Sequence, residues 1–308
     1  MDLTLISLFC VIDDFCQELL PQWNAILLED TNKKRNKPSQ MSTSEIMTIM
    51  IYFHKSNYRN FKMYYLHVIK GSMVKYFPNS VSYNRFVELM PSILLPLCFF
   101  IAAQGKTATG IYFVDSTILR VCHEKRASQN RAFKGLAKKS KSTMRWYYGF
   151  KLHIIVNDMG ELMAFKMSKA TTDDRVVLPK MAENLTGKII GDKGYISQKL
   201  FDQLYEKGLQ LITKIRKNMK NKLVLMIDKI LLRKRGIIES VFDQLKNISQ
   251  IEHSRHRSAD NFMVNIVAGL RKRRYLGRYF AHPMMQNRRA KRDDYKPSAV
   301  RVTQRYVP

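Results

Sequence analysis

Apolar residues recur every three or four positions along the first part of the chain. The earliest set consists of bulky side chains at Leu5, Ile6, Phe9, Ile12, Phe15, Leu19 and Leu20. This spacing predicts an amphipathic helix over residues 1–30. Ser42 and Glu45 have the pattern of a capping box, which predicts that another helix begins there. Because residues 82–94 repeat the helical spacing, residues 1–105 are predicted to be all-helical.

After Gly110 the spacing changes to that of strands alternating with helices. Short apolar or alternating runs predict strands at residues 111–115, 150–157, 162–170, 188–192 and 209–215. Helical spacing predicts helices at residues 174–185, 197–207 and 236–248. The segment 157–160 has the composition of a hairpin turn, so the first three strands can form an antiparallel meander. The predicted fold class is therefore α/β, a mixed sheet with flanking helices behind an all-helical N-terminal domain.

Positive charge dominates the composition. The chain has 53 Lys and Arg against 25 Asp and Glu, a net charge of +28. Such an excess indicates a polyanionic partner, and DNA or RNA is the simplest because neutralised phosphates release counterions. A ribosomal or membrane-surface protein could have the same balance. Basic residues also crowd the end of the chain, so residues 281–308 are predicted to be a partly disordered tail that contacts nucleic acid.

The spacing of the cysteines and the composition of the N-terminus indicate the cellular compartment in which the protein is expected. None of the four cysteines has zinc-finger or C-x-x-C spacing, and the N-terminus lacks the basic segment of a signal peptide. The apolar run at residues 92–104 is too short to span a bilayer and is interpreted as a buried helix. We therefore expect reduced thiols, a cytoplasmic location and no membrane partner.

Three acidic residues are candidates for a metal site. Asp115 and Asp192 each end a predicted strand, and Glu239 lies on the helix after the last strand. Mixed α/β sheets place active sites where neighbouring strands end. A buried unpaired carboxylate is costly, whereas two such acids can bind Mg²⁺ together with waters and phosphate oxygens. Taken alone, each acid could equally be a turn, helix-cap or solvated residue.

The residues around these acids resemble the three catalytic motifs of bacterial DDE insertion-sequence transposases. The matching runs are Val114-Asp115-Ser116-Thr117, Gly191-Asp192-Lys193-Gly194-Tyr195, and the segment from Arg235 through Glu239 to Lys246. Residues 146–153 (WYYGFKLH) resemble a strand motif of the same enzymes, and residues 77–86 (FPNSVSYNRF) fit the insertion sequence 982 family best. The resemblance covers roughly residues 40–280 and departs at Leu232, where related subgroups carry tyrosine.

This resemblance implies a ribonuclease H-like fold and a two-metal mechanism. Asp115, Asp192 and Glu239 would be the catalytic and metal-binding residues. Two Mg²⁺ ions, for which Mn²⁺ can substitute, would lie about 3.5–4 Å apart, activating the nucleophile and stabilising the leaving oxygen. Arg235 and Lys246, on the helix of Glu239, would reach the DNA backbone; the alternative is a solvated basic face.

A basic segment follows the first aspartate directly, between residues 120 and 151. We interpret it as a loop held over DNA, whose predicted DNA contacts are Arg120, Lys138, Lys139 and Lys151. Lys193, beside Asp192, is a further predicted DNA contact. Trp146 could stack on a splayed base, although aromatic strand residues are more often core. Asp173 and Asp174 are interpreted as helix caps, and His153 as a core or supporting residue.

The sequence therefore predicts residues 1–105 as a helical DNA-binding domain, 106–280 as the ribonuclease H-like catalytic domain and 281–308 as the basic tail. The expected function is a transposase that binds insertion-sequence ends and catalyses strand cleavage and strand transfer. Its expected partners are transposon-end and target duplexes, with a homodimer in the DNA complex, in a bacterial cytoplasm at the nucleoid. The alternatives are a structure-selective nuclease of the same fold and a non-catalytic repressor derived from a transposase.

Overall fold

The computed structural model describes residues 3–28, 39–56, 58–104, 107–142, 145–214, 225–252 and 256–271. The predicted tail at residues 281–308 lies outside this set. The first described elements are all helical, as predicted: α1 (Leu3–Leu28), α2 (Thr43–Phe53), α3 (Phe61–Tyr64), η1 (Tyr65–Ser72), α4 (Tyr83–Leu89), η2 (Met90–Ile93) and α5 (Leu94–Ala103). The capping box is confirmed, because the Ser42 side chain accepts from the Glu45 backbone and the Glu45 side chain accepts from the Ser42 backbone.

The remaining elements build the sheet and its covering helices. Along the chain they are β1 (Ile111–Cys122), η3 (Glu124–Arg126), β2 (Lys138–Lys141), β3 (Trp146–Asn157), β4 (Leu162–Lys169), α6 (Asp174–Met181), β5 (Gly187–Gly191), η4 (Lys193–Tyr195), α7 (Gln198–Tyr205), β6 (Leu209–Thr213), α8 (Met226–Lys234), α9 (Gly236–Asp243), η5 (Gln244–Ile248) and α10 (Ala259–Leu270). The sequence missed β2, which is short and consists of Lys and Ser, and the helices α8 and α10.

Strand order identifies the type of sheet. β3 pairs antiparallel with β1 along one edge and with β4 along the other, while β5 and β6 continue beyond β1 in parallel. The six-stranded sheet thus has the order β2-β3-β1-β5-β6, with β4 also paired to β3, so that β1, β3 and β4 form an antiparallel meander followed by two parallel strands. This is the ribonuclease H-like arrangement, so the predicted fold class is confirmed.

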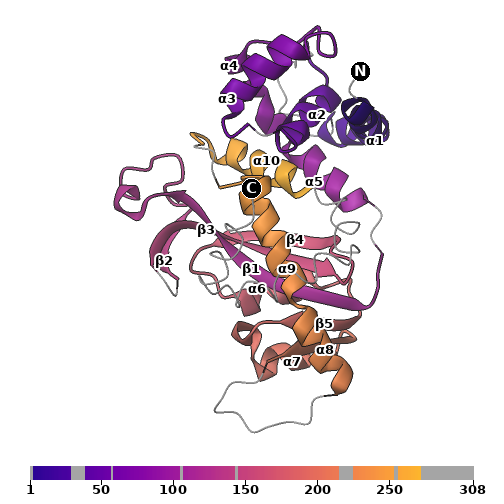
Figure 1. Cartoon of the computed structure of the whole chain (residues 1–308), viewed down its shortest axis with the longest axis vertical. Coiled ribbons are helices and arrows are strands. Elements are labelled where there is room, and N and C mark those ends of the chain that lie inside the picture. Colours follow the sequence, from indigo (N-terminus) through magenta and orange to yellow (C-terminus); the bar gives the residue numbers. More distant parts are fainter. Residues whose placement is uncertain are drawn as a thin grey trace, which may run out of the picture.

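Two apolar cores cover the opposite faces of the sheet. Side chains in a strand alternate between faces, and in β1 Phe113 joins the larger core whereas Tyr112 and Val114 join the smaller one. The smaller core lies under α6 and α7, and the larger one under α9 and α10. By this parity Asp115 shares the face of Phe113, the face that α9 crosses in Figure 1.

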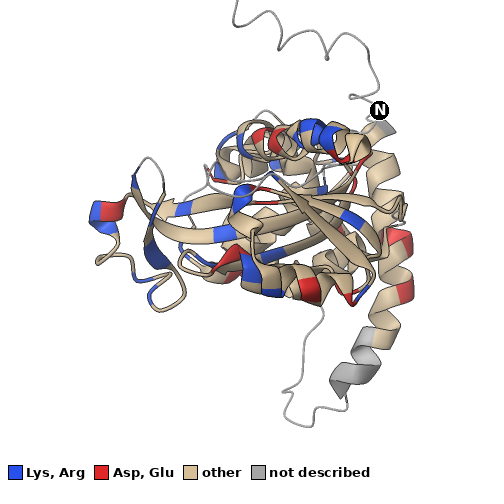
Figure 2. Ribbon diagram, turned by 90° about the horizontal axis from the view of Figure 1, so that it is seen from below, with Lys and Arg blue, Asp and Glu red and all other residues tan. Residues whose placement is uncertain are grey.

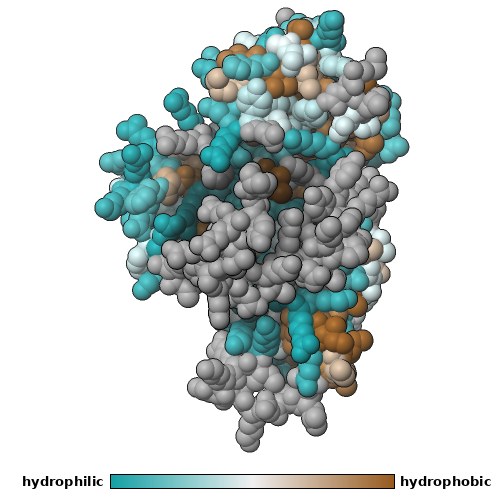
Figure 3. Space-filling model, viewed as in Figure 1, coloured by the Kyte–Doolittle hydropathy of each residue, from teal (hydrophilic) through white to brown (hydrophobic). Residues whose placement is uncertain are grey.

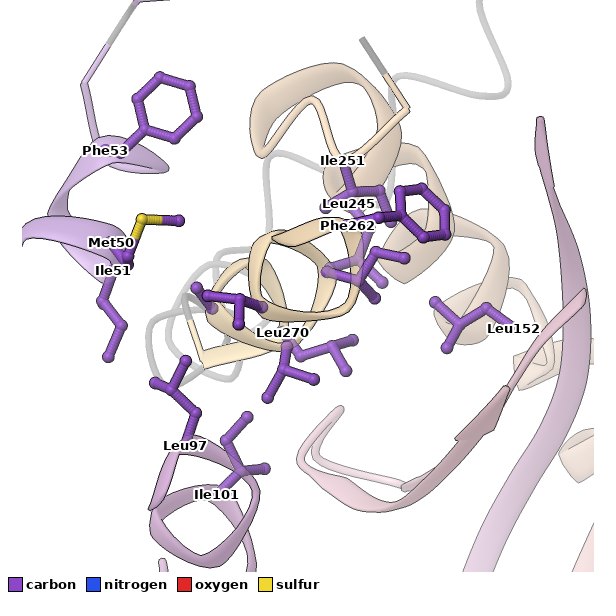
Figure 4. Packing of buried hydrophobic residues seen from close by; sticks show 14 of the residues in the cluster. Met50, Ile51, Phe53, Leu97, Ile101, Leu152, Leu245, Ile251, Phe262 and Leu270 are labelled. Atoms are coloured by element: carbon purple, nitrogen blue, oxygen red, sulfur yellow. The ribbon is translucent and has the colours of Figure 1, made fainter. Parts of the chain in front are cut away.

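Helix α10 links the helical part to the sheet. It packs on α2, η2 and α5, although the sequence assigned residues 259–270 to the catalytic domain. Figure 4 shows Phe262 and Leu270 of α10 between Leu97 of the helical part and Leu152 of β3. The larger core is therefore continuous from the N-terminal helices to the sheet.

One helical stretch is long and apolar enough to cross a membrane by length and composition. It runs from Tyr83 to Ala103, with a hydropathy of 2.1 over its most apolar window, of which 39% is buried. Within the described chain Phe86, Ile93 and Leu97 of this stretch are fully buried in the larger core. Core helices of soluble proteins pass the same test.

Beyond its pairing with β5, β1 continues into a protruding arm. The arm, residues 123–142, is held by Phe133, whose ring packs on Phe150 and Phe262 and whose carbonyl oxygen accepts from the Tyr148 hydroxyl at 2.9 Å. The predicted loop over DNA is therefore partly a strand, β2, paired with the start of β3.

At the base of the arm, β1 and β3 approach so closely that only glycine fits at residue 149. A Cβ there would overlap the carbonyl oxygen of Leu119, next to the bulge between Arg120 and Cys122. We expect Gly149→Ala to lower the free energy of unfolding by at least about 1–3 kcal/mol, the usual cost of overpacking.

The measurement is urea unfolding, with Gly71→Ala as the matched control. A Cβ at Gly71 meets only the Leu66 carbonyl oxygen at 3.7 Å, so that variant should be unchanged or gain up to about 1 kcal/mol. Equal stability of Gly149→Ala and wild type would contradict the close approach of the strands.

Candidate active site

Asp115 lies in the middle of a strand, which corrects the prediction that it ends one. β1 runs seven residues further, to Cys122, but its parallel pairing with β5 covers only Ile111 to Phe113. Asp192 follows directly after β5. The two aspartates thus lie where β5 stops while β1 continues, so the predicted juxtaposition arises from unequal strand lengths.

One guanidinium joins the two aspartates. Arg235 donates from Nη2 to Oδ2 of Asp115 at 2.6 Å and from Nη1 to Oδ1 of Asp192 at 3.3 Å. The Arg235 side chain is only 15% exposed, against 23% for Asp115 and 51% for Asp192. Such charge-assisted bonds are strong and directional. The ion pairs bring the start of α9 onto the middle of β1 and the end of β5.

Opposing effects act on the pKa of the Asp115 carboxyl, which is raised overall. Burial raises the pKa of this carboxyl above the ordinary value, whereas the Arg235 guanidinium and a hydrogen bond from the Ser116 backbone lower it. Asp192 raises the pKa again, because a second negative charge lies nearby. The Ser116 amide fixes the other carboxylate oxygen, Oδ1, at 2.8 Å.

Glu239 lies one helical turn after Arg235 on α9 and is exposed. Residues four apart share a helix face, so Glu239 is on the side of α9 that carries Arg235. In the described parts of the chain, no three His, Cys, Asp or Glu side chains lie close enough together to hold a metal ion. Between Asp115 and Asp192 the positive charge is supplied by Arg235.

The donor set nevertheless fits a hard cation. All three candidate ligands offer carboxylate oxygens, and Mg²⁺ and Mn²⁺ prefer oxygen ligands with waters and phosphates completing the shell. The guanidinium already bridges two carboxylates, so a cation there would replace one positive charge with a larger one.

Lys246 is held within the protein. Its ammonium donates to the Ile118 carbonyl oxygen of β1 at 2.8 Å and pairs with Glu252 at 3.4 Å. Glu252 also accepts from the Arg120 backbone amide at 3.0 Å. The alternative of a solvated basic face is therefore wrong for both Arg235 and Lys246. Sequence reasoning missed Glu252, since it lies just beyond the third motif and a lone acid there carries no signal of its own.

A second polar cluster occupies the opposite face of the sheet. Asp174 accepts from the Ser116 hydroxyl and from the Lys151 ammonium, each at 2.9 Å. His153 is buried as predicted, and burial lowers its pKa to about 4. Asp173 is the predicted cap of α6, whereas Asp174 belongs to this cluster. The predicted DNA contact Lys151 lies in the cluster, on the face away from Asp115.

In the second motif, the spacing between Gly191 and Tyr195 follows from the contact between these two residues. The Tyr195 ring lies under Gly191, where a Cβ would come within 3.0 Å of it, and the ring is buried in the smaller core. The turn that carries Asp192 and the exposed Lys193 is thereby fixed to the end of β5.

Basic residues recur along the arm, where they are blue on the ribbon of Figure 2. The exposed Lys and Arg residues of the arm and its base are Arg120, Lys125, Arg126, Arg131, Lys134, Lys138, Lys139, Lys141 and Arg145. Trp146, at the start of β3, is 55% exposed, whereas Tyr147 and Tyr148 are buried. Of the three neighbouring aromatics, Trp146 alone presents a large surface to solvent.

The sheet order and the paired aspartates define a ribonuclease H-like protein with an acidic site at the end of β5. Residues 105–259, just over half of the chain, match the family described as "Transposase DDE domain". The chain therefore belongs to the DDE transposase family, and its function is that of a transposase. No curated protein sequence matches the chain.

Solved transposase structures show more distant likeness. A piggyBac transposase synaptic complex with hairpin DNA is 12% identical, with 99% of this chain and 85% of that chain covered and a TM-score of 0.43. A Mos1 mariner paired-end complex with Mn is 8% identical, with 74% and 85% covered and a TM-score of 0.23. The strand order and the family match remain the grounds for fold and family.

Because Arg235 bridges the aspartates, it must compete with a cation for them. We expect Arg235→Ala to bind Mn²⁺ about ten- to a hundredfold more tightly without DNA, since each charge-assisted hydrogen bond contributes about 1.5–3 kcal/mol. In EDTA the same variant should melt at a lower temperature, because the two carboxylates lose their shared partner.

Calorimetric titration with Mn²⁺ measures the affinity, and Arg233→Ala serves as control because it removes an equal charge from an exposed position of α8. Weaker Mn²⁺ binding in Arg235→Ala than in Arg233→Ala would show that the guanidinium does not compete.

Proposed function

We propose that this transposase cleaves and joins DNA strands at insertion-sequence ends, using two Mg²⁺ or Mn²⁺ ions held by Asp115, Asp192 and Glu239. The observation that carries the proposal is the convergence of Asp115 and Asp192 on one cation, the Arg235 guanidinium. Carboxylates from two strands and a crossing helix leave open positions for the scissile phosphate and the nucleophile.

The bound ions would activate the attacking oxygen and stabilise the leaving one. The protein's own residues hold the proposed ligands in place. The Ser116 amide holds Asp115 in place at 2.8 Å, and Tyr195 fixes the turn of Asp192. With cations held by the carboxylates, the Arg235 guanidinium would be available to bind a backbone phosphate beside them.

Lys246 supports the site indirectly. It anchors η5 to the carbonyl oxygen of Ile118, three residues beyond Asp115 on β1. We assign it to positioning the helix of Glu239 against β1.

DNA contacts are proposed for the arm and its surroundings. The arm's exposed ammonium and guanidinium groups, Lys138 and Lys139 among them, suit phosphates, and Trp146 offers a ring for a splayed base. Figure 3 shows hydrophilic side chains gathered over the arm. Arg120 and Lys193 are exposed and belong to the same proposal.

Finer assignments follow from the motifs. Residues 77–86 and the three catalytic runs support membership of the insertion sequence 982 family. We propose that the protein acts as a homodimer on paired ends in a bacterial cytoplasm, because each reaction needs two DNA ends brought together.

Loss of any proposed ligand should abolish cleavage. Asp115→Asn, Asp192→Asn and Glu239→Gln keep the side-chain shape but weaken cation binding, so each should lower single-turnover cleavage by at least about a hundredfold, a loss of roughly 3 kcal/mol in the barrier. Duplex binding in EDTA should change little. A variant with near-wild-type cleavage in Mg²⁺ would remove that residue from the site.

Binding through the arm should depend steeply on salt. The slope of log affinity against log salt should shrink by about 0.9 for each phosphate that the protein no longer neutralises, so Lys138→Ala with Lys139→Ala should flatten it measurably. Lys207→Ala, an exposed lysine next to α7, is the control and should leave the slope unchanged. Identical slopes in all proteins would exclude the arm from the DNA interface.

A further inference from the structure

A cavity of about 980 Å³ lies where the N-terminal helices meet the start of α10. Its walls come from the start of α3, the first turns of α4 and the residues around the start of α10. None of the described residues assigned above to cleavage or DNA contact lines it. It is therefore a separate feature from the acidic site.

Cations surround this cavity. Arg59, Lys62 and Arg257 line it and are exposed, and no carboxylate in the described chain pairs with any of them. The one acidic residue of the lining, Glu88, is paired with Arg85 at 2.9 Å. The excess positive charge suits a phosphate.

Aromatic rings and amides form the inner surface. Phe61 and Tyr83 contribute rings whose centres are 6.3 Å apart, and the Lys62 ammonium lies 5.8 Å from the centre of the Tyr83 ring. A planar base can take the place of that flexible ammonium and stack on the ring. Amides, which recognise the donor and acceptor edges of bases, also line the cavity. Asn60 already caps α3 and Asn265 donates to the Ile251 carbonyl oxygen, which leaves Asn84 and Asn261 as the amides for a base.

Two buried polar atoms of the lining lack a hydrogen-bond partner. They are Nε2 of His256 and Oδ1 of Asn261, whose Nδ2 donates to the Val87 carbonyl oxygen at 3.3 Å. Burial lowers the pKa of His256 to about 4, so its ring is neutral at pH 7. A buried unsatisfied polar atom is costly, and a base edge would supply the missing partners.

We propose that this cavity binds one unpaired nucleotide of the DNA on which the transposase acts. The base would stack on Tyr83 and bond to the orphaned polar atoms, while Arg59 and Arg257 would hold the phosphates. This inference rests on the proposed function, because it presumes DNA as the substrate. Figure 1 places α3 and α4 on the side of the molecule from which the arm protrudes, so one DNA molecule can reach both.

The test compares two short duplexes of one sequence in EDTA, where no cleavage occurs. One carries a single unpaired 2-aminopurine nucleotide at its end, and the other is fully paired. The full chain should bind the unpaired form about tenfold more tightly at equal salt, and the 2-aminopurine fluorescence should fall as its base stacks.

Variants then locate the binding site. Tyr83→Leu should abolish both the preference and the quenching, and Arg257→Ala should reduce the preference. Lys75→Ala, an exposed lysine of the helical part outside the cavity, should retain both. Thermal melts establish that each variant is folded, and Arg257→Ala decides the matter if Tyr83→Leu melts early, because Arg257 is exposed.

Equal affinity of the wild type for the two duplexes would overturn the proposal, as would a preference that survives in folded Arg257→Ala and Tyr83→Leu. Its failure is distinct from failure of the proposed function. Metal-dependent cleavage with no preference rejects the cavity alone, whereas a preference without cleavage in Mg²⁺ rejects the catalytic proposal and leaves the cavity as a nucleotide site.

Discussion

The double ion pair of Arg235 with Asp115 and Asp192 is the interaction on which the site depends. Without a cation between them, the carboxylates of Asp115, within β1, and Asp192, after β5, repel each other, and the more buried one is costly to ionise. The guanidinium lowers the pKa of Asp115 without outweighing its burial, and it fixes the position of α9 over the strands. Glu239, the third acid of the candidate site, is one turn further along α9. The same contact therefore determines the direction in which α9 presents Glu239.

A further contact holds α8, the helix that precedes Arg235, against the sheet. Asp228 of α8, largely buried, accepts from the Lys188 ammonium of β5 at 2.6 Å, which holds the helix before Arg235 against the sheet. Parity along β1 then separates the acids, because Asp115 faces α9 while Ser116 faces Asp174 on the other side. Asp174 is thereby excluded as a rival ligand, although sequence spacing alone could not exclude it.

Much of the fold could be predicted because local signals agree with tertiary structure. The Ser42 capping box, the alternation of β3 and β4 and the helix stop at Gly208, which has φ of 75°, are each encoded within a few residues. The strand β2 and the extension of β1 beyond Asp115 were not predicted. β2 consists of Lys and Ser and forms through pairing with β3. The extension of β1 pairs with β3 as well, although Thr117, Ile118 and Val121 are residue types typical of strands. The contacts of Arg235 with Asp115 and Asp192, and of Lys246 with Ile118, escaped because they join segments far apart in sequence.

The contacts around Glu252 connect the parts of the molecule that would touch DNA. Glu252 receives the Lys246 ammonium and the Arg120 amide, so it ties η5 to the strand that carries Asp115 and leads into the arm. Four residues later the chain reaches His256, which lines the cavity beneath α3 and α4. The His54 ring contacts the Ser249 carbonyl oxygen at 2.7 Å, joining α2 to the same connection. The residues before this connection are therefore joined to β1 and η5 through Glu252 and to the end of α2 through Ser249.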